Sequence, residues 1–171
     1  GLCARSDGAV FCIVDTAIYY SNLGASGWTL VPVGTMPGTS WCRMVDAETH
    51  VVAVDGTNAR AITTAESFAT SRANFTDVAY QDGYTIYAET GTNSMYVSNI
   101  DDPTTIGALN FTTVDSTPGD IRAVISDHRE VFVFKSSSIE HFYNAGGPGF
   151  PFQRSNPGVI EAGIIETYTA A

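Results

Sequence analysis

The stretch "QDGYTIYAETGTNSMYVSNI", residues 81–100, decides the fold because it reads as two short strands joined by a turn. Its two apolar runs are rich in Tyr, Ile, Val and Thr, and a Gly-Thr-Asn segment separates them. Short β-branched and aromatic runs bounded by turn residues are typical of β-hairpins. The same order of turn, strand, turn and strand recurs in residues 6–23, 46–63 and 126–144.

The recurrence has a nearly constant period. The first strands of the four hairpins end 40, 34 and 46 residues apart, at Val14, Val54, Ala88 and Phe134. The connecting segments 21–46 and 98–127 also share an order of features: Ser-Asn, a polar turn, a strand, a Pro-Gly turn and another strand. Each unit therefore supplies about four short strands, and a four-stranded antiparallel unit every ~40 residues is typical of a β-propeller blade.

We therefore expect one all-β domain over residues 1–171, a β-propeller with repeats at roughly 1–40, 41–75, 76–120 and 121–171. Only residues 64–75 offer an alternative, a short helix. Residues 155–171 carry further apolar strand material without a matching half-blade. We expect the chain to be part of a larger propeller of about six blades, with an open edge and an apolar face at its ends.

Composition limits the functions that the chain can have. It has 171 residues, of which 44% are hydrophobic and 15% charged, and this is enough apolar material for a real core. The net charge of −10 disfavours tight binding to a phosphate backbone. No apolar run is long enough to span a membrane, and we expect neither a signal peptide nor a membrane partner.

No pattern in the sequence indicates catalysis or a resident metal or cofactor. The three histidines His50, His128 and His141 are far apart and lack the helical spacing of a metal site. Asp101 and Asp102 are better explained as a solvated turn than as a calcium site. The three cysteines have no close-pair spacing, and no nucleophile elbow or phosphate-binding loop occurs. We predict a protein without enzymatic activity and without a cofactor.

Residues 130–164, "EVFVFKSSSIEHFYNAGGPGFPFQRSNPGVIEAGI", resemble the packaged-DNA stabilisation proteins of short-tailed phages, also called tail accessory, tail hub or nozzle proteins. The resemblance is carried by Ser-Ile-Glu, an aromatic pair, Tyr-Asn-x-Gly-Gly, Phe-Pro-Phe-x-Arg and Val-Ile-Glu-x-Gly. These motifs cover about a fifth of the chain. The family often has a bulky aromatic residue or a cysteine where this chain carries Phe142 and Ile164.

The resemblance implies a structural role in the virion tail. It implies a homo-oligomeric ring, expected to be a hexamer, that contacts portal, adaptor and other tail proteins after assembly in the host cytoplasm. Such a ring holds the packaged genome and forms part of the channel through which DNA leaves, without sequence-specific binding. An acidic wall fits this role because it lets a phosphate backbone slide.

The segment after the fourth hairpin supplies the candidate site residues, Phe150, Phe152, Gln153 and Arg154. One interpretation is that prolines and glycines hold the two phenylalanine rings as a plug between blades. The other is that this segment anchors a neighbouring subunit or the adaptor, with Arg154 as a forked donor. The sequence leaves both open.

A different class of function also remains open, a carbohydrate-binding or carbohydrate-cleaving propeller. Aromatic side chains near the mouths of a propeller channel can stack on sugar rings, and Trp28, Trp41 and Tyr168 are the candidates.

Overall fold

A computed structural model describes residues 1–21, 23–24, 27–38 and 41–166. This part of the chain contains eighteen strands and no helix, so it has no helix that could cross a membrane. The strands form four four-stranded antiparallel sheets in chain order and one small hairpin. The prediction of an all-β fold built from four-stranded antiparallel units is confirmed.

The sheets use consecutive strands, apart from the inserted hairpin. The first contains β1 (Leu2–Ala4), β2 (Val10–Val14), β3 (Ala17–Ser21) and β6 (Val31–Thr35), and β4 (Leu23–Gly24) pairs with β5 (Gly27–Trp28) before β6. The second contains β7 (Arg43–Ala47), β8 (His50–Val54), β9 (Ala59–Ile62) and β10 (Ser67–Ala69). The third contains β11 (Phe75–Gln81), β12 (Tyr84–Glu89), β13 (Ser94–Val97) and β14 (Phe111–Thr113). The fourth contains β15 (Ala123–Asp127), β16 (Glu130–Phe134), β17 (Ile139–Asn144) and β18 (Phe152–Ile160).

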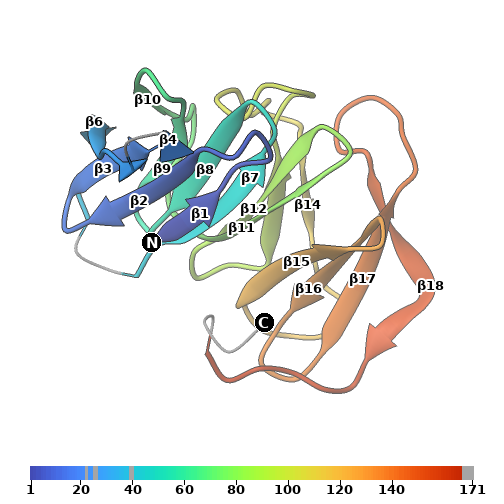
Figure 1. Cartoon of the computed structure of the whole chain (residues 1–171). Helices are drawn as coiled ribbons and strands as arrows, with labels where there is room; N and C mark the ends of the chain where they lie inside the picture. The colour runs from blue at the N-terminus through green and yellow to red at the C-terminus, as the bar shows by residue number, and fades with distance from the viewer. Residues whose placement is uncertain (22, 25–26, 39–40, 167–171) are drawn as a thin grey trace.

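The four sheets follow one another around an arc, as Figure 1 shows. The first strand of each sheet lies beside the first strand of the next, so β1, β7, β11 and β15 are neighbours in that order. These four are called the inner strands below. In Figure 1 they lie near the middle of the molecule, while β6, β10 and β18 lie at its periphery.

Apolar side chains fill the space between each sheet and the next. The first layer joins the first and second sheets and includes Phe11, Ile18, Met36, Val51 and Ile62. The second joins the second and third sheets and includes Val52, Ala61, Phe75, Tyr87 and Tyr96. The third joins the third and fourth sheets and includes Ile86, Met95, Val131, Val133 and Phe142. Both faces of a middle sheet are therefore buried, which is why its strands read as nearly continuous apolar runs.

The helix considered for residues 64–75 is wrong, because β10 lies within this segment and pairs with β9. The reason is a tight turn at Thr63, whose hydroxyl accepts hydrogen bonds from the backbone N–H groups of Ala65 and Glu66. The Thr63 N–H also donates to the Glu66 carbonyl. A hydroxyl that satisfies backbone donors in this way favours a turn over a helix interior.

After the last strand of each sheet, the chain passes the turn that joins the second and third strands of the same sheet. A backbone hydrogen bond marks each passage, from N–H to C=O: Met36 to Thr16, Asn74 to Thr57, Ile121 to Thr92 and Ile164 to Lys135. After the first three passages the chain enters the inner strand of the next sheet. The fourth follows β18 and has the same geometry.

The two ends of the arc present apolar sheet faces. On the fourth sheet, Phe132 and Phe134 face away from the third layer, opposite Val131 and Val133, and are half-buried. Ile160, paired with Ile139 on this outer face, is 51% exposed. On the outer face of the first sheet, Leu2, Cys12 and Tyr19 lie side by side, and Leu2 is 75% exposed.

Candidate functional site

The inner strands are the candidate wall of an axial channel, and they carry little net charge. Their charged residues are Arg43 and Asp46 on β7, Asp77 on β11 and Asp127 on β15. Arg43 and Asp77 form an ion pair, with Nε 2.9 Å from Oδ1. Asp46 and Asp127 lie toward the ends of their strands, so most of the charge of the chain lies elsewhere, on turns and loops.

Asp77 is a buried carboxylate that connects three sheets. Its Oδ1 accepts hydrogen bonds from Arg43 Nε and from the backbone N–H of Val78, each at 2.9 Å. Its Oδ2 accepts one from the backbone N–H of Val124, also at 2.9 Å. Burial raises the pKa of Asp77, and Arg43 and the two N–H donors act against this shift. Its side chain is fully buried, so these bonds replace the lost hydration and tie β7, β11 and β15 together.

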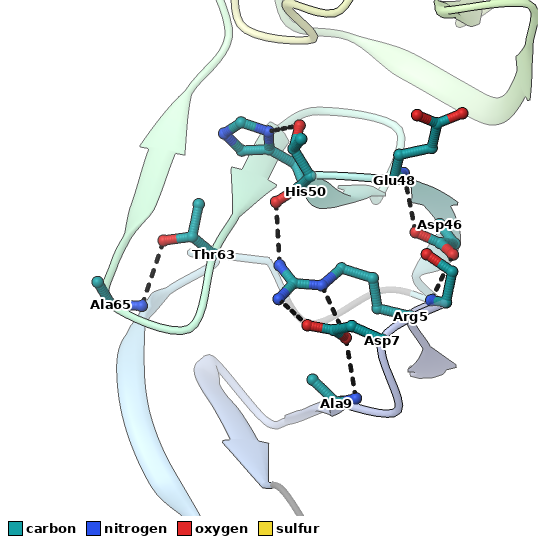
Figure 2. Close-up of polar contacts among 10 residues, drawn as sticks. Arg5, Asp7, Ala9, Asp46, Glu48, His50, Thr63 and Ala65 are labelled. Atoms are coloured by element: carbon teal, nitrogen blue, oxygen red, sulfur yellow. Dashed lines mark hydrogen bonds and ion pairs between the residues drawn. The ribbon is translucent and has the colours of Figure 1, made fainter.

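A second polar network joins the first and second sheets where β1 turns into β2, as Figure 2 shows. Arg5 makes a bidentate ion pair with Asp7, at 3.1 and 2.6 Å, and donates to the Thr49 carbonyl at 2.9 Å. Asp46 accepts a hydrogen bond of 2.7 Å from the Ser6 backbone N–H. The Arg5 guanidinium lowers the pKa of Asp7 to about 2. Polar links therefore occur at every junction between neighbouring inner strands.

The other part of the candidate site is the exit segment, residues 145–154, which follows β17 and includes the first three residues of β18. Gly146, Gly147 and Gly149 have φ values of 70°, 112° and 78°, a region that side chains disfavour. The segment therefore turns sharply, and its closing hydrogen bond runs from the Ala145 N–H to the Pro151 carbonyl.

The two phenylalanines of the exit segment lie in the third apolar layer. Phe152 is 4% exposed and meets the ring of Tyr84 edge-on at 5.9 Å. Phe150 is half-buried, packs against the same layer and lies 6.0 Å from Phe152. The position of these rings is the one that the plug interpretation predicts.

The two polar candidates of this segment are exposed. Gln153 lies on the surface, and its amide oxygen is 3.5 Å from the Tyr143 hydroxyl. The side chain of Arg154 is 43% exposed, and its Nη1 donates to Glu140 Oε2 at 3.1 Å and also to the Ser116 hydroxyl. Their role as interface residues stays a prediction.

Sequence reasoning missed the buried pair beneath Arg154. Lys135 and Glu140 are both fully buried, with Nζ 3.9 Å from Oε1. Lys135 donates to the carbonyls of Val114, at 2.6 Å, and Thr117. Burial lowers the pKa of Lys135. The available signal was the alternation of β17, which places Glu140 on the same face as Phe142 and so directs a carboxylate inward.

The remaining candidates lie apart from each other. His128 occupies a turn with a positive φ of 49°, His50 contacts Phe68 edge-on, and His141 stacks on Phe132. Asp102 accepts hydrogen bonds from the N–H and hydroxyl of Thr104, as a turn residue does. No group of three or more His, Cys, Asp or Glu residues that could hold a metal occurs in the described ranges.

The aromatic residues considered for sugar stacking are only partly described. Trp41 is 75% exposed. The side chain of Trp28 and the whole of Tyr168 lie outside the described residues.

The family model described as "Bacteriophage P22 Gp10, beta-propeller" matches residues 4–171. No curated protein matches the chain. Among solved structures, a functionally unknown protein from Desulfotomaculum acetoxidans DSM 771 is similar, with 10% identity and a TM-score of 0.61. The match covers 90% of this chain and 54% of that one, so the chain spans about half the length of this structural neighbour, and the likeness shows the fold alone.

Proposed function

The chain belongs to the phage family of P22 Gp10 β-propellers, and from this membership we propose that it is a non-enzymatic component of a tail hub or nozzle. In this role it retains packaged DNA in the virion and forms part of the channel through which the DNA leaves. Membership of this family makes the chain a phage structural β-propeller. The observation that carries the proposal is the position of the four inner strands, which lie side by side near the middle of the arc (Figure 1).

The chemistry of the inner strands supports passage of DNA without binding. Arg43 is their single cationic residue, and its charge is paired with Asp77. Phosphate contacts supply most of the affinity of non-specific DNA binding, and they require free Lys or Arg side chains. A wall with a paired guanidinium and a few carboxylates offers no such contact. Retention then depends on the width of the channel or on a partner that closes it.

We also propose that the functional propeller has more than four sheets, about six. The outer faces of the first and fourth sheets are apolar, with Leu2 and Ile160 well exposed. The passage at Ile164 repeats the geometry that elsewhere leads into the next inner strand. Gly163 allows this passage because a Cβ there would lie 2.3 Å from the Ser136 carbonyl carbon. Further sheets packed on these faces would bury them as the three existing layers are buried.

We also propose that copies of the protein form a hexameric ring that contacts the portal and the adaptor. If further sheets cover the two end faces, contacts between copies fall on exposed turns and on segments such as the one that carries Gln153 and Arg154. A rim of polar and charged residues is typical of such interfaces.

The proposal is tested with the full reading frame that contains this chain. Phage carrying a nonsense mutation in the gene is expected to fill its heads with DNA and then lose it, so that the packaged DNA becomes sensitive to nuclease. Supplying the protein in trans restores protection. Electron micrographs of the purified full-length protein with its adaptor are expected to show rings with a central opening.

Two results would contradict the proposal. Mutant heads that never fill would indicate a role in packaging rather than in retention. Micrographs that show monomers only, even with the adaptor present, would refute the proposed ring assembly. Nuclease protection separates these outcomes because it is measured on the particle and does not depend on how the isolated protein behaves.

A further inference from the structure

A cavity of about 360 Å³ lies between the third and fourth sheets, beside the outermost strands β14 and β18. It is distinct from the inner strands, and its size is at the lower end of the roughly 300–1,000 Å³ of small-ligand sites. Its polar lining comes from Thr112, Thr113, Asp115, Gln153 and Arg154. The rings of Phe142 and Phe152 supply its apolar part.

Buried groups fix the position of Arg154 at this cavity. Its Nη1 donates to Ser116 and to Glu140, which is fully buried, and Lys135 lies behind Glu140, also fully buried. Glu140 Oε1 accepts no hydrogen bond from the described residues and depends on Lys135 Nζ at 3.9 Å. A buried ion pair stabilises a fold little, because desolvation offsets the attraction. Its consequence here is an arginine held in one orientation at the cavity wall.

The charges around the cavity limit the class of ligand. Asp115 Oδ1 lies 3.9 Å from Arg154 Nη1, so a strong acceptor and a strong donor stand side by side. An anionic ligand attracted by Arg154 would be repelled by Asp115, whose side chain is 68% exposed. A hydroxyl group both donates and accepts and can bond to each. The Thr112 hydroxyl on the facing strand adds a further partner of the same kind, because Thr112 pairs with Met95 of the third layer and lies on the same sheet face.

We infer that this cavity binds a neutral, polyhydroxylated ligand, namely one sugar unit of a glycan. Arg154 donates to one hydroxyl of a vicinal pair, Asp115 accepts from its neighbour, and Thr112 bonds to a hydroxyl on the other side. This site differs from the aromatic positions considered from the sequence, and it does not depend on the tail role.

The experiment uses an array of neutral and acidic glycans, probed with the labelled chain and with three variants. Asp115→Asn removes the charge of an exposed carboxylate with little effect on folding. Thr112→Val keeps the size of the side chain and removes its hydroxyl. Asp120→Asn changes an exposed carboxylate of the same connection that does not line the cavity, and serves as the matched control.

We expect neutral glycans with vicinal diols to bind, and Asp115→Asn and Thr112→Val each to weaken that binding at least tenfold while Asp120→Asn leaves it unchanged. Three results overturn the proposal. The array yields no neutral glycan, or both cavity variants bind as the parent does, or only acidic glycans bind and Asp115→Asn strengthens them. Thermal melting of all four proteins, with equal midpoints, shows that lost binding is not lost folding.

Discussion

Replacing Asp77 with alanine should destabilise the chain, because this buried carboxylate is the partner of groups on three inner strands. The substitution leaves the Arg43 guanidinium without its partner and removes the acceptor of the Val78 and Val124 N–H groups. Removing one partner of a buried ion pair typically costs 3–5 kcal/mol, because the other charge stays buried. The side chain of Arg43 is 31% exposed, so water can solvate it in part, and we expect the lower end, about 3 kcal/mol.

The measurement is urea unfolding followed by circular dichroism at neutral pH. With a slope of about 2 kcal/mol per molar urea, the midpoint should fall by about 1.5 M. Asp77→Asn keeps an acceptor oxygen and loses the charge, so we expect it to fall between the parent and Asp77→Ala. Asp120→Ala, at an exposed position, should unfold with the parent.

Hydrogen exchange adds a local readout to the Asp77 test. The substitution Asp77→Ala should increase the exchange rate of the Val124 amide, relative to the parent, more than it increases the rates of amides in the first sheet. The reason is that the Val124 N–H loses its hydrogen-bond acceptor directly. A midpoint within 0.5 M of the parent, together with unchanged exchange at Val124, would refute the view that this carboxylate ties the inner strands.

The remaining predictions concern the exit segment, the last passage and the network of Figure 2. Phe152→Ala should destabilise the fold by about 3–5 kcal/mol in urea unfolding; a stable variant that no longer forms rings would instead support the anchor interpretation. Gly163→Ala should destabilise by about 1–3 kcal/mol, because its Cβ meets the backbone of Ser136, and an unchanged midpoint would contradict this. The pKa of Asp7 is about 2 when folded against an ordinary 3.8, so the unfolded chain binds more protons between these values and stability falls as pH falls through them. Melting midpoints measured from pH 5 to pH 2 should therefore drop less in Asp7→Asn than in the parent, and parallel curves would exclude this contribution.

The hairpins could be predicted from sequence because their signals are local. The Asp82-Gly83 pair has positive φ at both positions, as a two-residue hairpin turn requires, and this dipeptide is visible in the sequence. The alternation of "EVFVF" likewise predicts two apolar faces, and the structure buries one of them against the third sheet.

The polar links could not be predicted, because their partners come from different units. Arg43 and Asp77 lie 34 residues apart, and only the packing of β7 beside β11 brings them together. In the sequence, Asp77 is one carboxylate within the apolar run "FTDVAYQ", where a solvated edge position explains it equally well. The pairing of β11 with β12 also contains a register irregularity between Phe75 and Asp77, which no local pattern in the sequence predicts.

The placement of polar and apolar contacts bears on how copies of this propeller could assemble. Apolar layers join sheet to sheet around the arc, while the polar ties of Asp46 and Asp77 join the inner strands close to the axis. A further sheet can form another apolar layer and another polar link only by packing against an end face of the arc. These end faces are the ones that carry Leu2 and Ile160. A second copy docked on the same faces would compete with that closure. If copies form a ring, we therefore expect their contacts to fall on the turns and outer connections, where Gln153 and Arg154 remain accessible.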